Sequence, residues 1–225
     1  MGGVVMKFNS VFDIIGPVMV GPSSSHTAGA ARIAKVARDL FGQEPSWAKI
    51  HLYGSFQKTY KGHGTDFALV GGLLGFETDD LRMRDSLEIA KSKGMNIQFV
   101  EDAAATDHPN TVRIIIGAEE GQLELIGISI GGGKIEIKEL NGFELRLSGN
   151  HPAILIMHND RSGAIASVTS ILAQHNINIG HMSVNRKDIG KEALMIIEVD
   201  QNVDEHILDK LKHANHIIKI TKIDS

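Results

Sequence analysis

The segment from residue 21 to residue 27 concentrates side chains that could bind an anion or move a proton. It reads Gly21-Pro22-Ser23-Ser24-Ser25-His26-Thr27, and an alanine-rich helical pattern follows it. A helix N-terminus leaves backbone N–H groups unpaired and carries partial positive charge, so hydroxyl and imidazole groups placed there favour a carboxylate or phosphate ligand. Helix capping alone explains one hydroxyl, not three serines with a histidine and a threonine. The lysine of a P-loop is missing, so nucleotide binding is not favoured.

A second segment, Lys61-Gly62-His63-Gly64-Thr65-Asp66, lies between a predicted strand and a predicted helix. Glycines on both sides of His63 leave its imidazole room to approach a ligand, and histidine titrates near neutrality, as a general base must. Asp66 is placed either to cap the helix or to orient a histidine. On these residues alone, a surface loop with a solvated histidine is the alternative.

Two later segments carry weaker signals. In His108-Pro109-Asn110-Thr111 the proline restrains His108 to an extended backbone, but a simple turn explains the same residues. The segment Ser129-Ile130-Gly131-Gly132-Gly133 is either a tight glycine turn or a nest of successive N–H groups that accepts an anion. Neither segment decides a function by itself.

Near the start of the C-terminal third, residues 158–165 again join a predicted strand to a predicted helix. They read His158-Asn159-Asp160-Arg161-Ser162-Gly163-Ala164-Ile165. Asp160 or Ser162 can cap the helix, and Gly163 lets a ligand reach the backbone. An ordinary capped loop, a small anionic ligand and a dimer partner all fit this segment.

The composition excludes several kinds of chemistry. The 225 residues include no cysteine, so this chain supplies no disulfide, thiolate metal site or cysteine nucleophile. Its 11 histidines lack the spacing of metal ligands, so we predict no metal site. A net charge of −4 argues against nucleic acid or an acidic membrane as a partner. The longest apolar stretch, Phe67 to Phe76, is too short to span a bilayer, and the N-terminus lacks a signal-peptide pattern, so we expect a soluble cytoplasmic protein.

Hydrophobic periodicity predicts the elements that hold the first four segments. An apolar, turn-bounded segment covers Val11 to Val20. Helices are predicted at residues 28–41, 66–75 and 80–93, strands at 49–56, 96–100 and 111–117, and a hairpin of 123–130 with 134–140 around the triple glycine. A loop at 58–64 carries His63.

From His151 onward the patterns predict the order βαββαβ, the ferredoxin-like split unit. Strands are expected at 153–157, 179–185, 193–199 and 217–223, with helices at 162–175 and 203–214. The chain changes character at Ser148-Gly149-Asn150, so we expect two domains, residues 1–147 and 148–225, joined near residues 142–150. The predicted fold class is mixed α/β (α+β): an N-terminal substrate-binding domain followed by the ferredoxin-like domain.

The first four segments, taken together and in this order, resemble the beta chain of the two-chain, iron–sulfur L-serine dehydratases of bacteria. The C-terminal part resembles an ACT domain, a small amino-acid-sensing module. The resemblance covers essentially the whole chain. It implies that the N-terminal domain is similar to the allosteric substrate-binding domain of some phosphoglycerate dehydrogenases.

The same resemblance implies a partner, the alpha chain, which supplies the cysteines and the [4Fe–4S] cluster that this chain cannot hold. The implied reaction converts L-serine to pyruvate and ammonia without pyridoxal phosphate. In it, a cluster iron acts as a Lewis acid on the β-hydroxyl while a base removes the α-proton. ACT domains of the family often pair side by side, so a homodimeric contact between beta chains is also implied.

Residue roles follow from the resemblance by motif. His63 is implied as the acid/base or substrate-positioning residue at the interface with the alpha chain, with His108 and Ser129 lining the same site. Substrate-binding roles fall on Ser23, Ser24, Ser25, His26, Thr27, Lys61, Thr65 and Asp66. In the ACT domain, effector binding, with L-serine as the candidate, falls on Asn159, Asp160, Arg161, Gly163 and Asn178.

Three functions stay open on the sequence. The chain is a catalytic subunit of an L-serine dehydratase, a non-catalytic serine-sensing regulatory subunit, or a structural subunit whose motifs only contact the alpha chain. Serine and histidine side chains clustered at loop tips favour the first function over the third.

Overall fold

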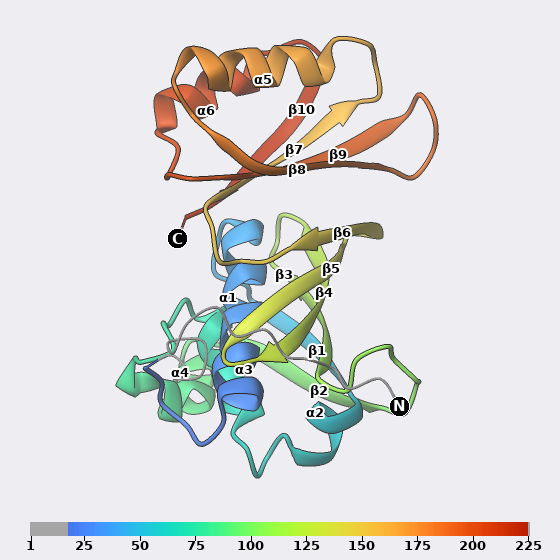
Figure 1. The fold of residues 1–225 in the computed structure, drawn as a ribbon. Helices are drawn as coiled ribbons and strands as arrows, with labels where there is room; N and C mark the ends of the chain where they lie inside the picture. The colour runs from blue at the N-terminus through green and yellow to red at the C-terminus, as the bar shows by residue number, and fades with distance from the viewer. Residues whose placement is uncertain (1–17, 225) are drawn as a thin grey trace, which may run out of the picture.

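The computed structural model describes residues 18–224, which fold around two β-sheets stacked one above the other in Figure 1. The predicted apolar segment from Val11 to Val20 lies largely outside the described residues. The first sheet belongs to the N-terminal unit and the second to the C-terminal unit.

The first sheet has six strands in the order β2-β1-β3-β4-β5-β6, with β1 and β2 parallel and the other neighbours antiparallel. Helices α1 (Gly29–Phe41) and α3 (Thr65–Leu73) lie together on one side of it (Figure 1). The structure confirms the predicted positions of these two helices, of the strands near residues 96 and 111, and of the hairpin around the triple glycine. The strands are β1 Trp47–Tyr53, β2 Asn96–Asp102, β3 Thr111–Gly117, β4 Gln122–Gly131, β5 Lys134–Leu140 and β6 Phe143–Leu147.

Three elements of this unit differ from the prediction. The strand expected to reach residue 56 ends at Tyr53, because Gly54 turns the chain with a φ of +54° and begins helix α2 (Gly54–Thr59). The helix expected over residues 80–93 is divided into a 3₁₀ turn, Leu81–Asp85, and α4 (Ser86–Ser92). The expected connection at residues 142–150 contains β6, whose alternation of buried and exposed residues is only five residues long.

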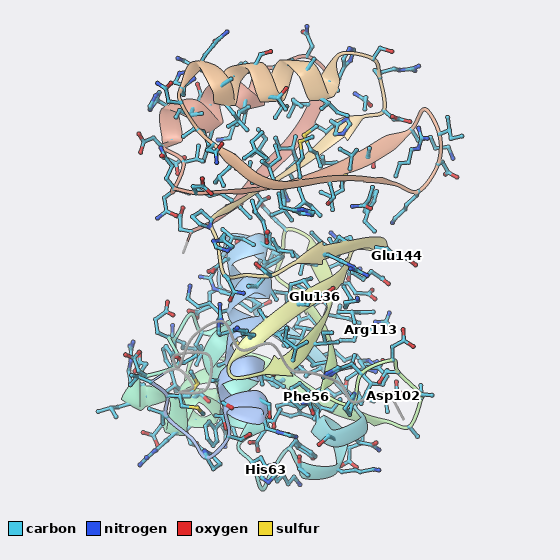
Figure 2. The ribbon with its side chains drawn as sticks, in the orientation of Figure 1. Phe56, His63, Asp102, Arg113, Glu136 and Glu144 are labelled. Atoms are coloured by element: carbon cyan, nitrogen blue, oxygen red, sulfur yellow. The ribbon has the colours of Figure 1, made fainter. Side chains whose placement is uncertain are left out.

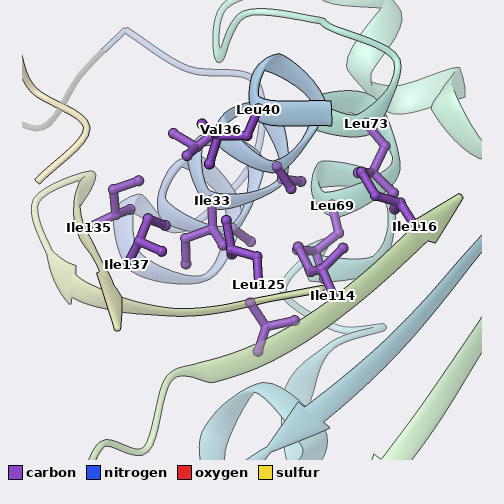
Figure 3. Packing of buried hydrophobic residues seen from close by; sticks show 14 of the residues in the cluster. Ile33, Val36, Leu40, Leu69, Leu73, Ile114, Ile116, Leu125, Ile135 and Ile137 are labelled. Atoms are coloured by element: carbon purple, nitrogen blue, oxygen red, sulfur yellow. The ribbon is translucent and has the colours of Figure 1, made fainter. Parts of the chain in front are cut away.

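Helix α1 is buried because its small and apolar side chains face neighbours on several sides. Ile33, Val36 and Leu40 meet side chains of α3 and of the sheet in Figure 3. Close approach depends on glycines, since a Cβ on Gly127 of β4 would lie 2.6 Å from Cγ2 of Ile33. A Cβ on Gly72 of α3 would collide with the backbone carbonyl oxygen of Ala31. The two helices and the sheet therefore pack at a distance that larger residues would not allow.

The second sheet has the strand order β10-β7-β9-β8, and its elements follow the predicted βαββαβ sequence, which confirms the ferredoxin-like fold. Helices α5 and α6 cover its outer face (Figure 1). None of the helices between residues 18 and 224 has both the length and the apolar character needed to cross a lipid bilayer. The elements are β7 Ala153–Asn159, α5 Ala164–Gln174, β8 Ile179–Arg186, β9 Glu192–Val199, α6 Glu205–Lys212 and β10 Ile217–Ile223.

The two units share one hydrophobic core. Leu155 and Ile196, on the inner face of the second sheet, belong to the same buried cluster as the residues around α1. Polar contacts reinforce this junction: the backbone N–H and the hydroxyl of Ser148 both donate to Oε1 of Glu198, at 3.0 and 2.8 Å. Arg32 of α1 donates to the carbonyl oxygens of Gly133 and Gly149, each at 2.8 Å. The connection between the units is thus hydrogen-bonded both to the first unit, through Arg32, and to the second unit, through Glu198.

We predict that Gly72→Ala destabilises the N-terminal unit. The new methyl group must displace the α1 backbone, and overpacking of this kind costs about 2 kcal/mol of unfolding free energy. Thermal unfolding followed by circular dichroism should show a midpoint lowered by several degrees. Gly180→Ala is the matched control, because its methyl group would meet Asp200 only at 3.4 Å. Equal midpoints for the two variants would contradict the tight packing of α1 on α3.

Candidate active site

The serine-rich segment forms the entry to α1. The hydroxyl of Ser23 accepts a hydrogen bond from the backbone N–H of His26 at 3.1 Å, as an N-cap residue does. A π-helical turn, Ser24–Ala28, then leads into α1. This wide turn exposes the side chains of Ser24, Ser25 and His26 partly to solvent while Thr27 is buried.

The imidazole of His26 is held at both nitrogens by serine hydroxyls. Nδ1 lies 3.0 Å from Oγ of Ser25, and Nε2 lies 2.8 Å from Oγ of Ser55. The ring also makes edge contacts with Phe56 and with His63, at centroid distances of 5.5 and 4.9 Å. Burial, and secondly the nearby His63, lower the pKa of His26 below the ordinary histidine value, so the ring is neutral at pH 7.

His63 lies on an exposed turn whose backbone is tied to α1 and α2. Thr27 donates its hydroxyl hydrogen to the carbonyl oxygen of His63 at 2.9 Å, and the N–H of His63 donates to Thr59. Gly64 follows with a φ of +69°, a conformation that favours glycine. Figure 2 shows His63 at the end of the N-terminal unit that lies farthest from the second sheet. The ring itself is left accessible to a ligand or a partner chain.

The other predicted residues of this segment lie in different environments. Lys61 is exposed, with Nζ 5.5 Å from the ring centre of Tyr60, and it borders a hollow of about 280 Å³ beside α2. Thr65 is buried at the start of α3. Asp66 accepts from the N–H of Phe67 at 2.8 Å rather than from a histidine, and burial raises the pKa of its carboxyl group.

The His108 segment joins the site through α2. The N–H of Ser55 donates to the carbonyl oxygen of Pro109 at 2.7 Å. His108 is partly buried, and its Nδ1 accepts from the N–H of Asn110 at 3.1 Å. An accepting Nδ1 carries no hydrogen, so the proton of the neutral ring is on Nε2. His108 can therefore offer an N–H donor from this loop.

Ser129 lies beneath the start of α1 and is completely buried. A Cβ on Gly29 would collide with its Oγ, so glycine at position 29 is what lets the helix begin here. The backbone N–H of Ser129 donates to Asn110, which links β4 to the His108 segment. Ser129 is thus next to the site but its hydroxyl does not open onto it.

Three buried polar atoms around these segments have no hydrogen-bond partner: Oγ1 of Thr65, Oδ1 of Asn110 and Oγ of Ser129. Such atoms are rare in folded proteins and call for an explanation, because each leaves a desolvated group unpaired. Among the described residues, no three histidine, aspartate or glutamate side chains are grouped so as to hold a metal ion. Each of the three unpaired oxygen atoms lies in one of the segments that carry the predicted site residues.

Sequence reasoning missed Ser55, which the predicted strand over residues 49–56 placed inside a sheet. It also gave no role to Asn110. The signal that could have found Ser55 is the preceding Gly54, since an isolated glycine inside a strand pattern indicates an irregularity or the close approach of another backbone.

In the second sheet, the predicted effector residues are only partly brought together. Asn159, Asp160, Arg161 and Gly163 form the β7–α5 loop, and Gly163 begins α5 with a φ of +91° and no side-chain cap. Neither Asp160 nor Ser162 caps the helix as expected, because the carboxylate of Asp160 accepts from Arg186 and from the N–H of Gly190, at 3.1 and 2.9 Å. The Gly190 N–H and the Arg186 guanidinium lower the pKa of Asp160.

Asn178 lies away from this loop. Asn159 pairs with Glu192 at the start of β9, whereas Ile179, which follows Asn178, pairs with Val199 at its end. The length of β9 therefore separates Asn178 from the loop by about 20 Å within one chain. Its side-chain amide donates to Asp200 instead, at 2.6 Å.

Comparison with known proteins matches two family models to separate parts of the chain. A family model described as serine dehydratase beta chain matches residues 10–139, and one described as ACT domain matches residues 153–213. The probable L-serine dehydratase beta chain of Bacillus subtilis strain 168 is 64% identical over 97% of this chain and 99% of its own length. The L-serine dehydratase beta chain of Peptoniphilus asaccharolyticus is 40% identical over 88% of this chain and 90% of its own.

A more distant relative covers only part of each protein. The D-3-phosphoglycerate dehydrogenase of Methanocaldococcus jannaschii is 29% identical over 59% of this chain and 25% of its own length. The two beta chains matched over at least 88% of this chain, and the family model over more than half of its residues, lead to one conclusion: the chain belongs to the serine dehydratase beta chain family and carries an ACT domain at its C-terminal end.

Proposed function

We propose that this chain is the beta subunit of an L-serine dehydratase, an L-serine ammonia-lyase that converts L-serine to pyruvate and ammonia. The observation that carries the proposal is the pair of His26 and His63, in edge contact at 4.9 Å where α1 begins. In this reaction the substrate loses its α-proton and its β-hydroxyl group. The resulting aminoacrylate tautomerises to an imine, and water hydrolyses the imine to the two products.

The partner in this proposal is an alpha chain that holds the [4Fe–4S] cluster. The residues of this chain do not fit a cluster, because the sequence contains no cysteine and the described residues group no alternative ligands. The proposal includes a cytoplasmic location, since cysteine thiolates that hold such a cluster need a reducing compartment. The beta chain then contributes substrate binding and proton transfer at the surface where the two chains meet.

Each group of site residues has a role within this proposal. His63 takes the α-proton, because its ring is accessible while its backbone is held by Thr27. Ser24, Ser25 and Lys61 bind the substrate carboxylate with hydroxyl groups and a cation. His108 supplies an N–H donor. The remaining predicted residues, Ser23, His26, Thr27, Thr65, Asp66 and Ser129, shape and hold the segments that carry these groups.

A reconstitution experiment tests the division of labour. Pyruvate formation from L-serine is measured under anaerobic conditions with the beta chain alone, the alpha chain alone and an equimolar mixture. We expect turnover only in the mixture, because the cluster and the proton-transfer groups lie on different chains. An alpha chain that is fully active alone would instead favour a regulatory beta subunit.

The role of His63 predicts a kinetic defect without a folding defect. His63→Ala should lower kcat of the reconstituted enzyme by about 10²-fold, the usual loss for a general base. The complex should still form, as measured by gel filtration, because the exposed ring holds no other element. His213→Ala, directly after α6, serves as the control, since that exposed histidine lies in the second unit, away from the site. Unchanged turnover of His63→Ala would remove His63 from the base role.

We further propose that the ACT domain binds L-serine at the β7–α5 loop and pairs with the ACT domain of a second beta chain. The uncapped start of α5, the open surface at Gly163 and the exposed Arg161 side chain support an anionic ligand there. Asn178 would belong to this site only if it came from the paired domain, because it lies at the far end of its own sheet.

Isothermal titration of the full chain with L-serine tests effector binding. Arg161→Ala should bind at least about 10-fold more weakly, because a carboxylate loses its cationic partner. Lys212→Ala, which removes an exposed lysine from α6, should bind like the wild type. Identical isotherms for Arg161→Ala and the wild type would leave the ACT domain with a dimerisation role only.

A further inference from the structure

Ser55 of α2 contacts two other segments of the candidate site although it belongs to none of the recognised motifs. Its hydroxyl lies 2.8 Å from Nε2 of His26, and its N–H donates to the carbonyl oxygen of Pro109 at 2.7 Å. Its own carbonyl oxygen accepts from the hydroxyl of Thr59 one turn later in α2, at 2.8 Å. One residue therefore joins the start of α1, the His108 segment and α2.

The position of Ser55 is fixed by the backbone around it. Gly54 turns the chain out of β1 with a φ of +54°, and a Cβ there would lie 2.6 Å from the carbonyl oxygen of Pro109. Both facts demand glycine. The next residue in sequence, Phe56, is completely buried and contacts the ring of His26. The backbone of Ser55 is thus held between Gly54 and the buried Phe56, and its hydroxyl points at His26.

Serine hydroxyls on opposite sides set the orientation of the His26 ring, and Oγ of Ser23 adds a longer contact to Nδ1 at 3.3 Å. Ser25 lies at Nδ1 and Ser55 lies at Nε2, so rotation of the ring out of this plane breaks both contacts. A serine hydroxyl can donate or accept, so a neutral imidazole satisfies both partners in either tautomer. Of these two partners, Ser25 is a neighbour in sequence, whereas Ser55 belongs to a different element.

We infer that Ser55 is a positioning residue of the active site, which acts through His26 on His63. Ser55 holds the His26 ring in the plane that lets it contact the edge or face of His63 at 4.9 Å. Packing against a fixed ring restricts the rotamers of the otherwise exposed His63 side chain. This inference rests on the proposed function, in which His63 takes the α-proton, and a small misplacement of such a base is costly.

Kinetics of the reconstituted enzyme test the inference. Ser55→Ala should lower kcat about 10-fold and leave KM within about twofold, because positioning of the base and not substrate binding is lost. Ser55→Thr keeps the hydroxyl and should retain at least half of the wild-type kcat. Ser92→Ala is the matched control, since that exposed serine bonds only to its own helix, at the carbonyl oxygen of Ile89, and should have no effect.

A double-mutant comparison tests whether Ser55 acts through His26. If it does, Ser55→Ala should cause no further loss of kcat in a His26→Ala background. Losses that multiply in the double variant would overturn the inference, as would normal kcat for His26→Ala or for Ser55→Ala. Thermal unfolding of each variant shows whether lost activity reflects lost structure.

NMR of the full beta chain separates this inference from the proposed function. The Cε1–H resonances of His26 and His63 are followed without the alpha chain or substrate. Ser55→Ala should shift both resonances and Ser92→Ala neither, even if the reconstituted wild type makes no pyruvate. If the His63 resonance does not shift in Ser55→Ala, the inference that Ser55 acts on His63 through His26 is overturned. An inactive wild-type complex would overturn only the proposed function.

Discussion

The close packing of α1 is the constraint on which the rest of the N-terminal unit depends. Its first residue, Gly29, lies directly over Ser129 of β4, and its backbone at Ala31 touches Gly72 of α3. Because Gly29 and Gly72 have no Cβ, the backbone can approach closely at both contacts, and this close packing fixes where the helix begins. The turn that carries His26 and Thr27 is fixed by that start, and Thr27 in turn ties down the backbone of His63.

The same helix connects the site to the second sheet. α1 is 13 residues long, about 20 Å, and its start carries the serine-rich turn. Arg32 bonds to Gly149 and Asn150 in the connection between the two units. The inner face of the ACT sheet shares its hydrophobic core with α1 rather than meeting it across water. The ACT domain therefore packs directly against the N-terminal unit, including the helix whose first residues follow the serine-rich turn.

The polar residues of the site are not satisfied within this chain. Thr65, Asn110 and Ser129 leave buried oxygen atoms unpaired, although the surrounding backbone is well hydrogen-bonded. A protein of this size tolerates few such atoms, and these three lie in the segments that carry the predicted site residues.

The ferredoxin-like second unit, most of the first sheet and the segments that carry the site could be predicted from the amino-acid sequence, because they depend on local periodicity and on glycine, serine and histidine in fixed order. Which side chains meet could be seen only in the folded chain. Ser55 was not found because periodicity extended β1 past Gly54, and only the tertiary structure shows that Gly54 turns the chain against the backbone of Pro109. The burial of Ser129 and the separation of Asn178 from its loop also depend on strand pairing between distant residues, which local patterns do not encode.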